Sequence, residues 1–259
     1  MPSRGLGEIL GAAFEIYKTN AAKLLTIVAV VVVPLTFVSA FLAYVVFKGS
    51  TTTTTIGDTT ITVSDRSFGF FILGTIVTLA ISVIISAMLQ AAIMRGAAQA
   101  TLGDPVDVDA SYRWGFSKIG SVILISILVG LAVAVGFIFF ILPGIFLAVM
   151  FAVAIPALVI ENRRGTEAMG RSWNLVKGHF WHALVVILVA GLITGIVSGI
   201  IGAIGGSNWI VRWIFTAIAQ IVVGPFAALV SILLYLDLRA RSESLTADQL
   251  RGEIATTNR

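Results

Sequence analysis

Long apolar stretches separated by short charged segments dominate the pattern of this 259-residue chain. Windows without any charged side chain cover residues 24–47, 67–94, 119–160, 178–211 and 213–236. About 20 helical residues cross the hydrocarbon core of a bilayer, so four of these windows each hold one membrane span. The third window is about twice as long as one crossing requires, which predicts two spans.

A turn divides that third window. Pro143-Gly144 lies near its middle, and proline followed by glycine interrupts a helix because an N–H is missing and the backbone is freed. We therefore expect a tight hairpin of two spans at Pro143 and Gly144. The predicted fold class is an all-α integral membrane protein with six transmembrane helices, at about 24–47, 69–94, 119–142, 145–161, 181–203 and 212–236.

The distribution of basic residues predicts the orientation of these spans. With six spans, 14 of the 17 Lys and Arg residues fall on the side that holds both chain ends. Because cytoplasmic loops carry the excess of Lys and Arg, we expect both termini in the cytoplasm. The membrane domain then covers residues 1–241, and residues 242–259 form a cytoplasmic tail, with a short surface helix expected after Thr246.

Segments rich in aromatic and basic residues precede the first, third and fifth spans. Before the first span, apolar residues recur at helical spacing from Leu6 to Tyr17. Such a helix has one apolar face, so we expect amphipathic helices at the membrane interface before spans 1, 3 and 5. The alternative is that any segment with an aromatic belt shows this pattern.

The outer connection, residues 48–66, is rich in threonine. Two β-branched runs, Thr51–Thr55 and Thr59–Val63, flank Gly57-Asp58. This pattern is typical of a small β-hairpin, and a polar linker is the alternative.

Composition excludes a soluble globule. Hydrophobic residues make up 58% of the chain and charged residues 12%, with a mean hydropathy of +1.03. An average soluble domain carries about 25% charged residues. The absence of cysteine removes thiolate chemistry, disulfides and Cys-based metal sites, and we expect no cofactor. Nucleic acid is a poor explanation of the net charge of +4, because the positive-inside distribution already accounts for it.

Few residues suggest chemistry. No charged residue lies in the middle of a span, which disfavours ion-coupled transport. Asp104, Asp107 and Asp109 could bind a divalent cation, but capping of the following helix by Asp107 or Asp109 is the simpler interpretation. His179 and His182 lack a third ligand, so we expect aromatic-belt anchoring rather than a metal site.

Glu161 closes the fourth span, and several arginines follow it. We expect Glu161 to form a structural ion pair with one of them. The functional alternative is a basic pocket for a lipid phosphate. The candidate contacts for that phosphate are Arg95, Arg113, Arg163, Arg164, Arg171 and Lys177.

Small residues recur every fourth position on the fifth span, at Gly191, Gly195 and Gly199. Such a face lets helix backbones approach closely. We expect it to pack inside the bundle, or alternatively against a second copy of the chain.

Four motifs together resemble a bacterial family. They are Gly-x-Ile-Leu-x-x-Ala-Phe-x-x-Tyr from Gly7 to Tyr17, the Pro143-Gly144 hairpin, Pro156 to Glu161 with Ala168, Arg171, Ser172 and Leu175, and Tyr-x-Asp-x-Arg-x-Arg-x-Glu from Tyr235 to Glu243. Over nearly the whole chain they are similar to the membrane-domain family of glycerophosphoryl diester phosphodiesterase and to related six-span proteins. The resemblance implies a lipid-adjacent membrane module without the soluble phosphodiesterase domain that some members carry.

These observations predict a non-enzymatic, multi-pass protein of the bacterial cytoplasmic membrane. Its expected partners are membrane lipids, anionic at the cytoplasmic face, with a protein partner as a further expectation. The alternative function is a permease or lipid translocator that is not coupled through intramembrane charges. A lipid-modifying enzyme that uses Asp107 and Asp109 is a third and more distant hypothesis.

Overall fold

The computed structural model describes residues 4–47, 51–56, 59–64, 68–204 and 208–243. Side chains at residues 42–71 and at some further positions up to residue 88 lie outside this description, as do those of Leu35, Ser39 and Trp209. The elements follow one another as α1 (Leu6–Phe47), β1 (Thr51–Ile56), β2 (Thr59–Ser64), α2 (Phe68–Leu102), α3 (Val108–Phe139), α4 (Ile141–Met150), α5 (Ala154–Glu161), α6 (Thr166–Lys177), α7 (Phe180–Ala203) and α8 (Trp209–Glu243).

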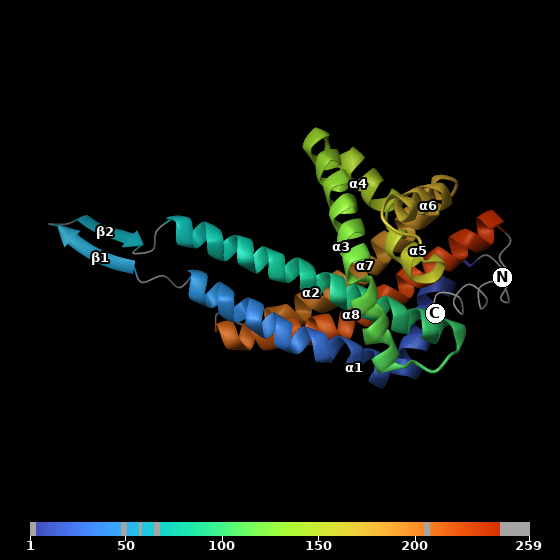
Figure 1. The fold of residues 1–259 in the computed structure, drawn as a ribbon, viewed down its shortest axis with the longest axis horizontal. Coiled ribbons are helices and arrows are strands. Elements are labelled where there is room, and N and C mark those ends of the chain that lie inside the picture. Colours follow the sequence, from blue (N-terminus) through green and yellow to red (C-terminus); the bar gives the residue numbers. More distant parts are fainter. Residues whose placement is uncertain (1–3, 48–50, 57–58, 65–67, 205–207, 244–259) are drawn as a thin grey trace.

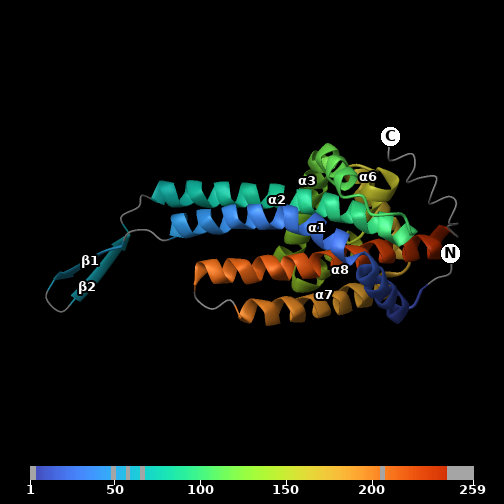
Figure 2. The same cartoon turned by 90° about the horizontal axis from the view of Figure 1, so that it is seen from below.

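Long helices run side by side along the long axis of the molecule. α8 packs against α1, α2 and α7, and α1 packs against α2 (Figures 1 and 2). The β1–β2 hairpin lies beyond one end of this bundle, whereas the start of α1 and the end of α8 meet at the opposite end. α3 and α4 leave the bundle together at a steep angle (Figure 1).

Five helical segments of the described chain are long and apolar enough to cross a membrane: Leu6–Val38, Val108–Phe139, Ile141–Glu161, Phe180–Ala203 and Ile210–Glu243. The predicted span at 69–94 lies within α2, where many side chains are outside the description. The count of six and the orientation in the membrane therefore stay predictions.

The predicted position of the turn in the third window is wrong. α3 ends at Phe139, Phe140 is extended with φ −167°, and α4 begins at Ile141. Pro143 lies in the first turn of α4, where backbone N–H groups have no partner within the helix, so the missing N–H costs nothing. Gly144 allows the two helices to approach, because a Cβ on Gly136 would lie 2.9 Å from the Gly144 Cα.

The predicted fourth span is also divided. α4 ends at Met150, and α5 begins at Ala154 after a short turn. Pro156 lies in the first turn of α5, so it begins a helix rather than bending the middle of one. Pro34 and Pro225, in contrast, lie inside the continuous helices α1 and α8.

Of the three expected interfacial helices, one is a separate element. α6 is amphipathic, with Ala168, Ser172, Leu175 and Val176 buried on one face. The segments before the first and third spans instead continue into α1 and α3 as single helices. The first turns of α1 run at an angle to the rest of that helix (Figure 2).

The predicted β-hairpin in the outer connection is confirmed. β1 and β2 pair antiparallel, with Thr51 opposite Ser64 and Ile56 opposite Thr59. Its turn, residues 57–58, lies outside the described residues. The same holds for residues 244–259, and therefore for the surface helix expected after Thr246.

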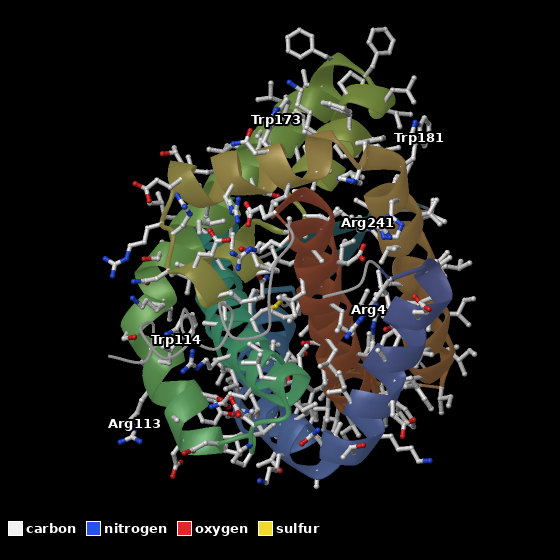
Figure 3. All side chains as sticks on the ribbon, turned by 90° about the vertical axis from the view of Figure 1, so that its right-hand side faces the viewer. Arg4, Arg113, Trp114, Trp173, Trp181 and Arg241 are labelled. Atoms are coloured by element: carbon white, nitrogen blue, oxygen red, sulfur yellow. The ribbon has the colours of Figure 1, made fainter. Side chains whose placement is uncertain are left out.

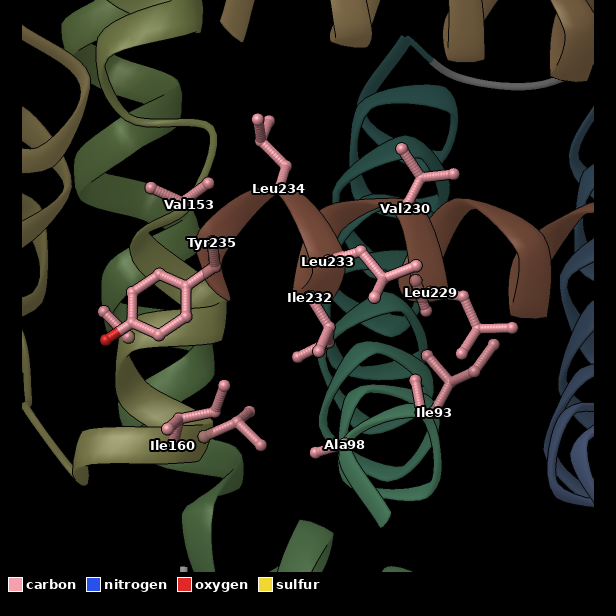
Figure 4. Packing of buried hydrophobic residues seen from close by; sticks show 14 of the residues in the cluster. Ile93, Ala98, Val153, Ile160, Leu229, Val230, Ile232, Leu233, Leu234 and Tyr235 are labelled. Atoms are coloured by element: carbon pink, nitrogen blue, oxygen red, sulfur yellow. The ribbon is translucent and has the colours of Figure 1, made fainter. Parts of the chain in front are cut away.

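The core is centred on the C-terminal half of α8. Residues from Ala228 to Leu238 are almost all buried there, and the Tyr235 side chain has no exposed surface. Figure 4 shows Leu229, Ile232 and Leu233 beside α2, while the Tyr235 ring reaches toward α5. This burial fixes the direction in which the polar residues at the end of α8 project.

Candidate functional site

The last turns of α8 present polar residues on two faces. Consecutive residues of an α-helix are rotated by about 100°, so residues four apart share a face and residues two apart point away from each other. Tyr235, Arg239 and Glu243 therefore lie on one face, and Asp237 and Arg241 on another. The alternating motif at the end of the sequence thus serves two separate ion-pair networks.

The first network centres on Glu161, the last residue of α5. Arg171 donates two hydrogen bonds to its Oε1, at 2.7 and 2.8 Å, and one to Oε2 at 2.9 Å. Arg163 donates to Oε2 at 2.8 Å, and the Tyr235 hydroxyl donates to Oε1. Only 8% of the Glu161 side chain is exposed, so these donors replace the water that the carboxylate loses on burial.

Arg171, on α6, connects Glu161 with the end of α8. Its two terminal nitrogens donate to the two carboxylate oxygens of Glu243, and the bond from Nη2 to Oε2 is 2.7 Å long. The bonds to Glu243 and then those to Glu161 raise the pKa of Arg171, although burial opposes the shift. Arg239 completes the network, with Nε 3.1 Å from Glu243 Oε2 and 3.3 Å from Glu161 Oε1.

A tight turn of residues 162–165 brings α6 back over Glu161. Asn162 ends α5 in the left-handed region with φ +54°, which asparagine tolerates better than most residues. Gly165 has φ +54° and ψ −126°, a conformation that requires glycine. The turn therefore sets the direction from which Arg171 approaches.

Ser172 holds α6 against the break between α4 and α5. Its buried hydroxyl donates to the Met150 carbonyl at 2.7 Å and accepts from the Val153 N–H at 3.3 Å. These are backbone groups at the helix ends, which lack partners within their own helices. Ser172 therefore ties the position of α6 to the break between α4 and α5.

The second network centres on Asp237, whose side chain is completely buried and contacts the start of the chain. The Arg4 N–H donates to Oδ1 at 2.5 Å, and Arg241 Nε donates to Oδ2 at 2.7 Å. Arg241 also donates to the Arg4 carbonyl at 2.6 Å. Nε2 of His182, on α7, lies 2.9 Å from Asp237 Oδ2 without hydrogen-bond alignment. Figure 3 views this end of the molecule and shows Arg4 and Arg241 together.

The six cations predicted to contact a lipid phosphate occupy different surroundings. Arg163 and Arg171 are bound to Glu161, as the ion-pair interpretation of Glu161 expects. Arg113, Arg164 and Lys177 are exposed, and no ion pair with another described residue forms at any of them. Arg95 is buried on α2, where its guanidinium lies over the Trp114 ring.

Sequence reasoning missed the members of these networks that lie on α8: Asp237, Arg239, Arg241 and Glu243 as ion-pair partners, and Tyr235 as a donor to Glu161. The signal was present in the four-residue spacing of the motif, which places its members on two helix faces. Their partners on α5, α6 and the N-terminal segment are distant in sequence and carry no such signal.

The small-residue face on α7 does not pack within the described chain. Gly191, Gly195 and Gly199 are exposed, and a Cβ added to any of them meets no atom within 4 Å. The expected packing inside the bundle is therefore not observed, and packing against a second copy stays a prediction.

An apolar groove of about 490 Å³ lies between the start of α1 and the middle of α7 and α8. Its lining includes Phe14, Ile193, Val222 and Phe226. Tyr17 crosses it and donates from its hydroxyl to the Val222 carbonyl at 3.1 Å. The side chains that line the groove are mainly apolar.

Of the acidic candidates, Asp107 has a structural role in this arrangement. Asp107 caps α3, with its side chain accepting from the Ala110 N–H at 3.0 Å, so the capping prediction is confirmed. Within the described residues no group of three or more His, Asp or Glu side chains could hold a metal ion.

Comparison with known proteins agrees with the resemblance stated above. Residues 129–238 match the family model of the membrane domain of glycerophosphoryl diester phosphodiesterase. The match runs from the middle of α3 to the end of the buried part of α8, and it confirms the resemblance over that range. The motif from Gly7 to Tyr17 lies outside it and stays a resemblance. No curated protein sequence and no solved structure matches the chain.

Proposed function

We propose that this chain is a non-enzymatic, lipid-associated membrane module of the bacterial cytoplasmic membrane. The end that carries Arg4 and Glu243 faces the cytoplasm in this proposal. The observation that supports it best is the division of charge at that end. The carboxylates of Glu161, Asp237 and Glu243 are occupied by arginines of the chain itself.

Several exposed cations form no ion pair with a carboxylate of the described residues. They include Arg113 on α3, Arg164 after α5 and Lys177 on α6. Anionic lipid headgroups attract basic residues near the membrane surface by about 1 kcal/mol each. A surface of this kind fits anionic lipids better than nucleic acid, because long apolar helices surround it.

A permease or lipid translocator is the second candidate function. The groove beside Phe14 and Val222 is the observation in its favour, because it reaches the middle of α7 and α8. Its lining is apolar, which fits an acyl chain and not a polar solute. Transfer of a fluorescent lipid between the leaflets of proteoliposomes tests this candidate, and a rate equal to that of protein-free liposomes contradicts it.

Spin-labelled lipids test the proposed function. Electron paramagnetic resonance on proteoliposomes compares the association of labelled phosphatidylglycerol and phosphatidylcholine with the protein. We expect stronger association of phosphatidylglycerol, and a loss of about fivefold for Arg113→Glu, Arg164→Glu or Lys177→Glu. Equal association of the two lipids with the unmodified protein contradicts the proposal.

Arg212→Glu is the matched control. Arg212 is exposed at the opposite end of the bundle, in the first turns of α8. Its reversal changes the net charge by the same amount, and we expect a loss of no more than about twofold because it reverses one cation at the other membrane surface. A loss as large as that of the three test variants would assign the selectivity to net charge alone.

A further inference from the structure

A second group of cations, centred on Arg95, is separate from the two ion-pair networks. Arg95 lies on α2 with only 4% of its surface exposed. Its guanidinium carbon is 5.6 Å from the centre of the Trp114 ring on α3. No carboxylate pairs with Arg95 in the described part of the chain.

Two donors of this pair are buried without an acceptor. Arg95 Nε and Trp114 Nε1 both lie beneath the surface, and neither has a hydrogen-bond partner among the described residues. Buried donors are almost always satisfied, because an unmade hydrogen bond loses the free energy of hydration without compensation. The terminal nitrogens of Arg95 also make no hydrogen bond with another described residue, so the guanidinium has donors to offer an acceptor.

The packing of α2 on α3 holds this pair in place. A Cβ on Gly115 would lie only 3.3 Å from the Ala92 backbone nitrogen, so the two backbones are in close contact there. Trp114 precedes that contact on α3 and Arg95 follows it by one helical turn on α2. Their geometry therefore comes from rigid helices and not from a loop.

Further positive charge lies one turn along α3. Lys118 is four residues after Trp114, so the two share a face of the helix. Its ammonium donates to the neutral Asn162 Oδ1 at 2.7 Å and experiences repulsion from Arg164. Neither Lys118 nor Arg164 forms an ion pair with a described carboxylate.

We propose that Arg95, Trp114, Lys118 and Arg164 form a binding site for a phosphate group, carried by an anionic lipid or present as free phosphate. The choice of a lipid as the source of the phosphate rests on the proposed function. The unpaired donors of Arg95 and Trp114 are observed independently of that function. A guanidinium binds phosphate in a planar, two-point geometry, and the indole N–H adds a donor beside it. Three cations offset the charge of the bound group.

Isothermal titration calorimetry on the full chain in mild detergent tests the site. The probes are inorganic phosphate, dihexanoyl phosphatidic acid and, as the neutral lipid, dihexanoyl phosphatidylcholine. We expect Arg95→Gln to weaken binding of the phosphate-bearing anion by about tenfold or more, since a hydrogen bond to a charged group is lost. Trp114→Phe keeps the ring, removes the N–H and should weaken binding by at least about threefold.

Arg212→Gln is the control, because Arg212 is an exposed cation in the first turns of α8, at the opposite end of the bundle. It should change affinity by less than about twofold. If Arg95→Gln does not fold, the binding measurement is made on Trp114→Phe and Lys118→Gln instead. The melting temperature of each variant, compared with that of the unmodified protein, shows whether it is folded. An equal loss in Arg212→Gln overturns the site in favour of attraction by net charge alone.

The probes separate the two sources of phosphate. Binding of both anions with the same dependence on Arg95 supports a site open to free phosphate, and binding of phosphatidic acid alone supports the lipid as the ligand. Absence of binding of either anion to the unmodified protein overturns the site. In that case the lipid association measured with spin-labelled lipids still decides the proposed function, so the two failures are distinguishable.

Discussion

The hydroxyl of Tyr235 donates to Glu161, and this single bond joins the end of α5 to the buried part of α8. The two residues are 74 positions apart in the sequence, and the Tyr235 side chain has no exposed surface. The contact fixes where the Glu161 carboxylate lies and therefore where Arg171 must approach. The fold of the basic end depends on this relationship.

Removing the Glu161 charge should destabilise the protein strongly. Glu161→Gln removes the more buried of the two carboxylates that Arg171 and Arg239 contact and leaves them only Glu243, which costs about 3–5 kcal/mol. Denaturant unfolding in detergent measures the change in the free energy of unfolding. Glu167→Gln, on the exposed first turn of α6, is the control and should cost less than about 1 kcal/mol. Similar losses in both variants would contradict the network.

Tyr235→Phe removes one hydrogen bond to a charged acceptor and keeps the ring. We expect a loss of about 1.5–3 kcal/mol in the free energy of unfolding. Tyr17→Phe is the comparison, because the Tyr17 hydroxyl donates to a neutral carbonyl, that of Val222. It should cost about 0.5–1.5 kcal/mol. A larger effect at Tyr17 than at Tyr235 would contradict the central place of Glu161.

Two glycines close to α6 should respond to alanine with opposite signs. Gly165 has φ +54° and ψ −126°, so Gly165→Ala strains the turn and costs about 1–3 kcal/mol. Gly170 lies inside α6 with open space around it, so Gly170→Ala should stabilise by about 0.5–1 kcal/mol. Thermal melting in detergent compares the two, and a stabilising Gly165→Ala would show that the turn is not required.

Asp237→Asn should loosen the beginning of the chain. The Arg4 N–H and Arg241 both bind this buried carboxylate, and loss of its charge weakens both contacts. Hydrogen exchange measured by mass spectrometry should show faster exchange over residues 5–12. Glu243→Gln changes the other face of α8, so exchange in this segment should remain as in the unmodified protein. Faster exchange in both variants would mean that the two networks are not separate.

Local sequence patterns predict the long apolar helices, the outer hairpin and the Asp107 cap, because these depend on nearby residues, whereas the break between α4 and α5 is not predicted. They place the turn at Pro143-Gly144, since a proline in the first turn of a helix gives the same sequence signal as a proline in a break. Glu161 was found because its arginines are near in sequence. Its contacts with Tyr235 and Arg239 arise from packing between distant helices, which periodicity does not encode.

Native mass spectrometry of the protein extracted in mild detergent tests lipid association most directly. We expect a retained anionic lipid at fixed stoichiometry, selected over phosphatidylcholine when both are present in excess. We also expect retention to decrease in Arg164→Glu and to persist in Arg212→Glu. A protein that carries no lipid, or that retains both headgroups equally, would contradict the account, and chemical crosslinking would then search for a protein partner at the basic end.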